Sequence, residues 1–244
     1  MNRKRLLTLA ALVTLIISSI CLPRPSTRPV AAASGWLSTA AALLALTLTW
    51  DYAGDSTGDD VGYAVGVAGD VNGDGYSDII VGAPKDTRTT DGVDREGVAY
   101  LFHGSPAGLS HSPNWTAGSG QKGANFGASV ATAGDVNNDG FDDVIVGADR
   151  YNNGQSAEGM AFVYFGSAAG LSASPGWSCE SDQKDAYLGV AVGTAGDVNG
   201  DGYADVVVGA KWYSNDQTNE GRAYLFYGSA AGLSDIPDWI AEID

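Results

Sequence analysis

One acidic segment occurs three times along the chain, and this repeat constrains the fold more than any other feature of the sequence. Each copy reads Ala-Gly-Asp-Val-Asn, then Gly or Asn, then Asp-Gly, and the copies open at Asp70, Asp135 and Asp197. The repeat length of about 60 residues is typical of a supersecondary unit that stacks on its neighbours. The chain is therefore expected to fold as a row of similar units that share their apolar faces.

Each unit contains the pattern of four short strands. A strand of small and β-branched residues precedes the acidic segment, and a run of Val and Ile, an alternating aromatic strand and a strand that begins at tryptophan follow it. Glycine accounts for 34 of the 244 residues, which indicates many tight turns and argues against a helical bundle. Four such strands form one antiparallel sheet, and a four-stranded repeat of about 60 residues is typical of a β-propeller blade.

The ends of this row are expected to be open. Trp50 matches the strand-opening tryptophans Trp115, Trp177 and Trp239, which predicts a partial strand belonging to a preceding, incomplete unit. Three complete units cannot close a ring, because closed propellers have about four to eight blades. Apolar blade faces are unstable in water, so the arc is expected either to self-associate or to continue in further blades. Two copies of the chain would supply about six blades, a number that can close.

The repeated motifs resemble those of a known family. The triplet Gly82-Ala83-Pro84, the pair Phe126-Gly127 and the Asp-x-Asn-x-Asp-Gly-x-x-Asp loops between them are similar to FG-GAP repeats, the blades of the integrin alpha-chain propeller and of bacterial secreted relatives. The resemblance covers residues 61–244 and implies an all-β fold of three four-stranded blades in an incomplete or open β-propeller. The other units depart from the motif at Val61-Gly62, Leu188-Gly189, Asp149 and Lys211, but they keep its glycines.

The repeats divide the chain into five predicted parts. These are a signal peptide (1–33), an N-terminal segment with a partial strand (34–60) and three FG-GAP blades (61–126, 127–188 and 189–244).

The N-terminal residues are typical of an export signal. A short basic region (2–5) precedes fifteen apolar residues (6–20), which is short for a membrane span, and Ala31-Ala32-Ala33 fits a cleavage site before Ser34. An uncleaved N-terminal anchor is the alternative. A second apolar stretch, residues 37–48, is also too short to span a bilayer. The protein is therefore predicted to be secreted or held at the cell surface.

The charge of the chain excludes some classes of partner. The formal net charge is −16 at pH 7, and five of the 13 basic residues lie in the predicted signal peptide. A body this acidic repels phosphate backbones and anionic membranes, so neither a nucleic acid nor a membrane surface is expected as a partner. So many carboxylates point instead to a metal ion.

The acidic loops have the ligand spacing of a calcium site. Positions 1, 3, 5 and 9 carry side-chain oxygens, position 7 would offer its carbonyl oxygen, and the glycine at position 6 permits a sharp turn. An oxygen-only shell of about six or seven ligands suits Ca²⁺ better than Mg²⁺, and the absence of Cys and His from the loops excludes a zinc site. We expect about three ions, one per repeat. The predicted ligands are Asp70, Asn72, Asp74, Tyr76 and Asp78 in the first loop, Asp135, Asn137, Asp139, Phe141 and Asp143 in the second, and Asp197, Asn199, Asp201, Tyr203 and Asp205 in the third.

The loops resemble two other kinds of structure. An EF-hand begins in the same way but requires a glutamate at position 12, which is Val81, Val146 or Val208 here. Turns rich in Asp and Asn that merely connect strands are the simpler alternative. Three copies in register, each with the closing aspartate, favour calcium. Asp142, an extra acid at position 8 of the second loop, is expected to face solvent.

No catalytic constellation is evident in the sequence, so the protein is predicted not to be an enzyme. There are only two histidines, and His103 falls at an aromatic strand position where packing is expected. Cys179 aligns with alanines and is expected to be a small buried residue. Tyr151, Trp212 and Tyr213 lie in the variable loops and are expected to be exposed.

The resemblance to integrin alpha chains implies an adhesion or binding module. An extracellular protein or glycan would then meet the loops between the second and third strands, residues 84–96, 149–158 and 211–220, at the end opposite the calcium loops. The alternative is a non-catalytic propeller fragment of an exported hydrolase or polysaccharide lyase.

Overall fold

The computed structural model describes residues 50–54, 58–87 and 96–242. The predicted signal peptide (1–33), its cleavage site and the apolar stretch 37–48 lie outside the described residues. Within the described ranges, no helix has both the length and the hydropathy that a membrane span requires.

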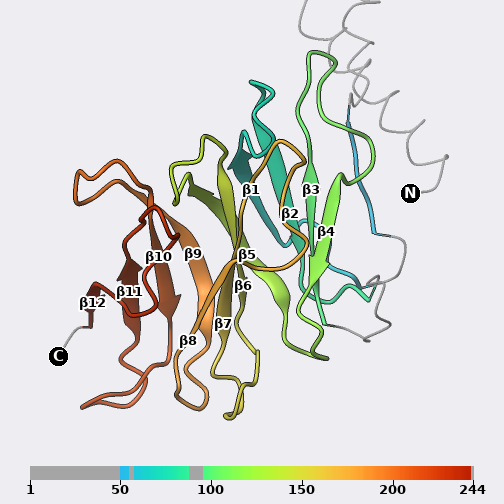
Figure 1. The fold of residues 1–244 in the computed structure, drawn as a ribbon. Helices are drawn as coiled ribbons and strands as arrows, with labels where there is room; N and C mark the ends of the chain where they lie inside the picture. Colours follow the sequence, from blue (N-terminus) through green and yellow to red (C-terminus); the bar gives the residue numbers. More distant parts are fainter. Residues whose placement is uncertain (1–49, 55–57, 88–95, 243–244) are drawn as a thin grey trace, which may run out of the picture. The chain divides into compact units, whose positions relative to one another are not determined.

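The described residues form three four-stranded antiparallel sheets, one from each repeat (Figure 1). The strands in each sheet follow chain order. The first sheet is β1 (Ala64–Gly69), β2 (Asp78–Ala83), β3 (Val98–Phe102) and β4 (Trp115–Gly118); the second is β5 (Phe126–Gly134), β6 (Asp143–Ala148), β7 (Met160–Tyr164) and β8 (Trp177–Glu180); the third is β9 (Leu188–Gly196), β10 (Asp205–Ala210), β11 (Arg222–Phe226) and β12 (Trp239–Ala241). The predicted fold class, blades of an incomplete and open β-propeller, is confirmed: the three sheets do not close into a ring.

The central strands are apolar on both faces, and this composition requires the sheets to stack. In β2, Ile80 and Val81 point to opposite faces, yet both are buried. One core lies between the first and second sheets and contains Ile80, Leu101, Phe126 and Phe162. A second core lies between the second and third sheets and contains Ile145, Val163, Val208 and Phe226. Each sheet therefore buries an apolar face against its neighbour.

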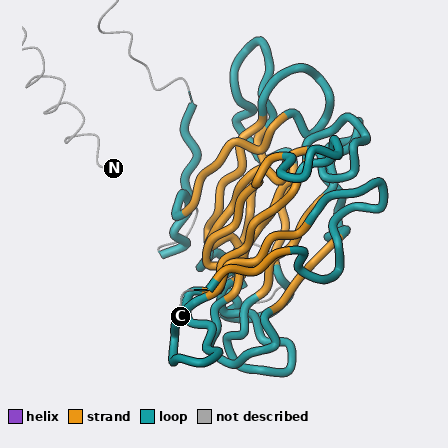
Figure 2. Tube along the Cα trace, turned by 90° about the vertical axis from the view of Figure 1, so that its left-hand side faces the viewer, coloured by secondary structure: helices purple, strands orange, loops and turns teal. Residues whose placement is uncertain are grey.

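The connecting loops gather at the two opposite ends of the strands (Figure 2). The acidic loops, which connect the first strand of each sheet to the second, lie at one end. The loops between second and third strands lie at the other end, because β2, β6 and β10 run the full depth of their sheets between the two sets of loops.

Glycines of the two repeated motifs meet where neighbouring sheets touch. A Cβ added at Gly82 would overlap the carbonyl oxygen of Gly127, and one added at Gly147 would overlap that of Gly189. Gly127 and Gly189 also have φ values of +83° and +82°, which side chains other than glycine rarely adopt. The motifs that identify the repeat are thus the points where two backbones come into contact.

The tryptophans that open the fourth strands connect each sheet to the next. The indole Nε1 of Trp115 donates a hydrogen bond to the carbonyl oxygen of Ser172 at 2.9 Å, and that of Trp177 donates to Ser234 at 2.9 Å. Each ring also packs edge-on against an aromatic residue of the next sheet, at 4.8 Å between centroids: Tyr164 for Trp115 and Phe226 for Trp177.

Trp50 makes the same contact with the first sheet without belonging to a strand. Its Nε1 donates to the carbonyl oxygen of Ser110 at 2.7 Å, and its ring lies 5.1 Å from that of Phe102. Tyr52 packs on the same ring at 4.8 Å. The predicted partial strand is absent from the described residues 50–54, since these supply no neighbouring strand with which it could pair. The equivalence of Trp50 with the later tryptophans is confirmed at the level of its side chain.

We predict that the contribution of these tryptophans to stability depends on whether a sheet follows them. Trp177→Ala is expected to lower the free energy of unfolding by about 3–5 kcal/mol, because it opens a cavity in the core between two sheets. Trp239→Ala is expected to lower it by less than about 1 kcal/mol, because this side chain is 53% exposed. Chemical denaturation at a concentration low enough to exclude association measures both values. Equal losses for the two variants would contradict this account of the stacking.

Candidate functional site

The three acidic loops share one set of internal hydrogen bonds, to which the third loop adds a bond from the Gly200 N–H to the Asp197 carboxylate at 2.7 Å. The carboxylate at position 1 accepts the N–H of position 5 on one oxygen and the N–H of the glycine at position 6 on the other. For Asp70 the two distances are 3.0 and 2.8 Å, for Asp135 they are 3.0 and 2.8 Å, and for Asp197 they are 3.1 and 2.9 Å. The first aspartate thus holds each loop in one curled conformation.

The asparagine at position 3 and the aspartate at position 5 are connected in the same way in every loop. In the first loop, the Asn72 Oδ1 accepts the N–H of Asp74 at 3.0 Å, and its Nδ2 donates to the Asp74 carboxylate at 3.1 Å. The Asp74 carboxylate also accepts the N–H of Tyr76 at 3.0 Å. The corresponding bonds of the second and third loops lie between 2.8 and 3.1 Å.

The aspartate at position 9 lies at the start of the second strand and is fully buried. Asp143 accepts the N–H of Val136 at 3.0 Å and that of Gly166 at 2.8 Å, so it joins its own loop to the segment after β7. Asp78 and Asp205 bond in the same way to the corresponding residues of their sheets, at 2.8 to 3.1 Å. Position 9 therefore fixes the loop to the sheet.

Burial makes two of these aspartates, Asp143 and Asp78, harder to ionise. The pKa of Asp143 is raised from 3.8 to about 7. Burial is the main cause, the nearby carboxylates of Asp139 and Asp135 add to it, and the hydrogen bonds from the two backbone N–H groups oppose it. Burial is also the main cause that raises the pKa of Asp78, and Asp74 adds to it. The carboxylates of one loop are thus close enough to repel one another, and a cation beside them would relieve that repulsion.

The donor set of each loop fits Ca²⁺ in its chemistry. Three carboxylates and one amide oxygen come from a single turn, and a carboxylate oxygen that accepts one N–H keeps a second lone pair for a cation. Within the described ranges, no three His, Cys, Asp or Glu side chains have the spacing of a formed metal centre. The structure therefore orders the predicted ligands around a shared turn, where their side-chain oxygens bond to the loop's own backbone.

Neighbouring loops are bonded to one another across the sheet boundaries. The N–H of Asp142 donates to the carbonyl oxygen of Asp70 at 3.1 Å, and the N–H of Ala204 donates to that of Asp135 at 3.0 Å. The Asp142 carboxylate also accepts the N–H of Asp70 at 2.8 Å. The expectation that Asp142 faces solvent was wrong: its side chain is half-buried against the preceding loop, because position 8 points toward that loop.

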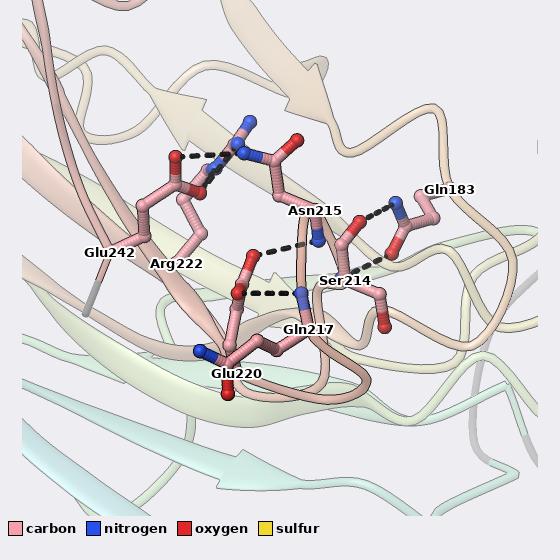
Figure 3. Close-up of polar contacts among 7 residues, drawn as sticks. All are labelled: Gln183, Ser214, Asn215, Gln217, Glu220, Arg222 and Glu242. Carbon is pink, nitrogen blue, oxygen red and sulfur yellow. Dashed lines mark hydrogen bonds and ion pairs between the residues drawn. The ribbon is translucent and has the colours of Figure 1, made fainter. Parts of the chain in front are cut away.

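At the opposite end, the loops between second and third strands are held by polar contacts (Figure 3). The Gln183 side chain accepts the N–H of Ser214 at 2.6 Å and donates to its carbonyl oxygen at 2.7 Å. Gln121 makes the same pair of bonds with Asn152. Glu220 accepts the N–H groups of Asn215 and Gln217 at 2.7 and 3.2 Å. The recurrence of glutamate before glycine (Glu96, Glu158 and Glu220) was visible in the sequence, but its role as a loop anchor was not predicted.

The aromatic residues of these loops differ in exposure from what the sequence predicted. Trp212 is exposed, at 46%, and lies beside the ring of Tyr187 and the ammonium group of Lys211. Tyr151 and Tyr213 were also expected to be exposed, but both are half-buried. Tyr151 packs against Phe162 and the core between the first and second sheets. Tyr213 lies under the guanidinium of Arg222, at 3.9 Å from the ring centroid.

His103 and Cys179, the other two residues singled out in the sequence, both pack against neighbouring parts of the protein. His103 is half-buried, with Nδ1 at 3.4 Å from the Asn72 Nδ2, so it lies against the first acidic loop. Cys179 pairs with Ala161 between β7 and β8, and burial raises the pKa of its thiol. A thiol in these surroundings is a poor nucleophile.

Comparison with known proteins decides the family. The model of the FG-GAP repeat matches residues 61–102, 126–164 and 188–226, which start at or just before the first strand of each sheet and end with the third. The chain is an FG-GAP repeat protein. The matches stop before the tryptophan strands, which the structure adds to each FG-GAP blade.

Similar proteins include several integrin alpha chains. This FG-GAP repeat chain is 38% identical to integrin alpha-PS2 of Drosophila melanogaster over 46% of its own length and 8% of the relative's. It is 36% identical to integrin alpha pat-2 of Caenorhabditis elegans over 67% and 13%, and 28% identical to integrin alpha-5 of Xenopus laevis over 66% and 16%. The chain thus spans less than a fifth of the length of these relatives.

We predict a pH dependence of stability that Asp143 causes in calcium-free buffer. The folded protein keeps a proton on Asp143 up to about pH 7, whereas the unfolded chain releases it near pH 3.8. This contribution to stability is therefore complete below the lower pKa and is lost as the pH rises through about 7. Asp143→Asn cannot titrate, so its melting temperature should approach that of the wild type as the pH rises from 4 to 8.

Asp143→Asn also lowers the free energy of unfolding by an amount that does not depend on pH. Its amide accepts only one of the two backbone N–H groups, which costs about 1–3 kcal/mol at every pH. Scanning calorimetry across this pH range gives the difference between the two proteins, and a difference that does not change with pH would contradict the assignment.

Proposed function

We propose that the chain is an exported, calcium-binding β-propeller module that binds an extracellular protein or glycan and is not catalytic. The observation that carries the proposal is the threefold repetition of one hydrogen-bonded loop, with the same oxygen donors at the same positions. A turn that served only to connect strands would have no need to preserve Asp, Asn, Asp and a buried Asp at four fixed positions three times over.

The residues that would hold the ions are the fifteen predicted ligands, five from each loop. Bound Ca²⁺ would supply positive charge beside three carboxylates that otherwise repel one another. The chain's own contribution is to keep these oxygens on one turn. The position-1 aspartate curls the loop, and the position-9 aspartate fixes it to the sheet.

Calcium would also stabilise the boundaries between blades. The carbonyl oxygens of Asp70 and Asp135 accept N–H groups from the next loop, so an ion that orders one loop also orders a contact of its neighbour. Ligand-dependent stabilisation of the native state then appears as a rise in melting temperature.

The proposed ligand surface lies at the other end of the strands. The loops 149–158 and 211–220 differ in sequence, while buried or half-buried glutamates and the amides of Gln121 and Gln183 anchor their backbones. Variable side chains on a rigid frame are typical of binding surfaces. Trp212 is the large exposed aromatic residue in these loops, and aromatic residues often supply much of the binding energy at interfaces. Residues 88–95 of the predicted loop 84–96 lie outside the described residues.

Calcium binding is tested by titration of the purified exported protein. We expect sites of the weak extracellular class, with dissociation constants of about 10⁻⁴ to 10⁻³ M, and a calcium-dependent rise in melting temperature. Asp74→Ala should remove one site and leave two, because the bonds within each loop are its own. Asp216→Asn serves as the control, because Asp216 is an exposed acid outside the three acidic loops, and it should leave all calcium sites unchanged. The absence of both heat and a melting shift in the wild type would refute the proposal.

Ligand binding is tested separately on a glycan array and on immobilised extracellular matrix proteins, with calcium and with a chelator. For a ligand that the wild type binds, Trp212→Ala should weaken binding about tenfold or more. Ile236→Ala removes a side chain that is 74% exposed near the acidic loops, at the other end of the strands, and should have little effect. Equal losses in the two variants would place the ligand elsewhere.

A further inference from the structure

The two outermost sheets expose side chains whose counterparts inside the row are buried. Val65 in β1 is 67% exposed, whereas Val130, at the same position of β5, is 8% exposed because the first sheet covers it. Trp239 in β12 is 53% exposed, whereas Trp177 in β8 is 7% exposed because the third sheet covers it. Both differences arise because the described residues place no further sheet beside these strands.

These residues define two faces. The β1 face consists of Tyr63, Val65 and Val67, which are 67%, 67% and 54% exposed, together with Val81, Tyr100 and Phe102, which are buried. Trp50, Tyr52 and Val61 pack against these buried residues, so docking on this face displaces all three of them. The β12 face consists of Val207, Leu225 and Trp239. The counterparts of Val207 and Leu225 in the second sheet, Ile145 and Val163, are fully buried. By repetition of the two existing sheet boundaries, the β12 face is complementary to the β1 face.

A glycine on the β12 face supports this complementarity. Gly82 and Gly147 are needed because the backbones of Gly127 and Gly189 press against them. Gly209 occupies the same position in β10, yet no atom comes within 3.7 Å of a Cβ placed there. Glycine weakens the interior of a strand unless another backbone approaches it. Gly209 therefore leaves room for an approaching backbone, and Gly62 is the residue of the chain that corresponds to Gly127 and Gly189.

The acidic loops at such a boundary are also compatible. At the existing boundaries, the N–H of Asp142 or Ala204 at position 8 donates to the carbonyl oxygen of the preceding loop's first aspartate. At a boundary between two copies, the position-8 residue would be Ser77 of the first loop. The carbonyl oxygen that faces it would belong to Asp197, the first aspartate of the third loop. A neutral serine adds no charge beside that loop, so no like charges oppose each other there.

The contact surface for a tryptophan on the β1 face is already filled. Trp50 bonds to Ser110 and packs on Phe102 as Trp177 does with Ser234 and Phe226, but residues 50–54 have no sheet that holds them in place. Trp239 belongs to β12, which pairs with β11 through Ala241, Ile240 and Trp239 itself. A tryptophan fixed in a sheet can therefore replace one carried by an unpaired segment.

We propose that a second copy of this chain docks on the first, with the β12 face of one copy on the β1 face of the other and Trp239 in the place of Trp50. The contact is heterologous, so in a pair one copy keeps a free β1 face and the other a free β12 face, and the copies form rings where the rotation closes and longer rows where it does not. Two copies joined at both faces would give about six blades, within the range of closed propellers.

The test is light scattering on the full chain, with its predicted signal removed by the exporting host, at micromolar concentration. We expect the wild type to exceed the mass of one chain. Val65→Asp and Trp239→Ala each disable one face, and both should be monomeric. Trp212→Ala removes an exposed aromatic residue that lies on neither face, and it should associate like the wild type. Both disabled residues are more than half exposed, so the variants are expected to fold, and circular dichroism checks this.

Mixing the two disabled variants distinguishes this arrangement from others. The Val65→Asp copy keeps an intact β12 face and the Trp239→Ala copy keeps an intact β1 face, so a mixture should form dimers of one copy each and nothing larger. Trp50→Ala vacates the contact surface and should shift association to lower protein concentration. A monomeric wild type, a mixture that stays monomeric, or weaker association of Trp50→Ala would each overturn the proposal.

Discussion

Each sheet of this protein has two apolar faces, and the rest of the structure depends on covering them. Ile80 and Val81 are adjacent in β2 and point in opposite directions, yet neither is exposed to water. A sheet of this composition cannot be stable alone, so the folding unit is the row of sheets and not the single repeat. The close backbone contacts at Gly82 and Gly147 and the indole bonds of Trp115 and Trp177 follow from this requirement.

The acidic loops also contact one another because the sheets stack. The buried aspartate at position 9 connects its loop to the segment that follows the third strand of the sheet, and the first aspartate's carbonyl oxygen connects the loop to the next one. The proposed calcium ions would therefore bind where three elements meet. The carboxylates that repel one another lie in the same loops that connect neighbouring sheets. A cation bound there would therefore stabilise both the loop and the contact between the sheets.

Much of this could be predicted from the sequence because each repeat is local and the spacing within its acidic segment is the same in all three copies. The strand order and the start of each fourth strand at tryptophan followed from residue patterns alone. Asp142 was misjudged because its contact is with a loop 72 residues away, and no local pattern reports such a distance. Tyr151 and Tyr213 were misjudged because the side chains that cover them belong to other strands. The anchoring role of Glu158 and Glu220 could have been inferred from their recurrence before glycine, although their backbone partners could not.

The contact of Asp142 makes the two sheet boundaries unequal. Between the first and second sheets, the loops exchange two bonds, since Asp70 and Asp142 donate to one another. Between the second and third, Ala204 has no carboxylate and only its N–H takes part. That boundary has a side-chain bond of its own, because the Ser129 hydroxyl in β5 donates to the carbonyl oxygen of Gly189 at 2.7 Å, whereas β1 has Ala64 at the same position. Each boundary therefore carries one side-chain bond that the other lacks, at the acidic loops in the first and within the strands in the second.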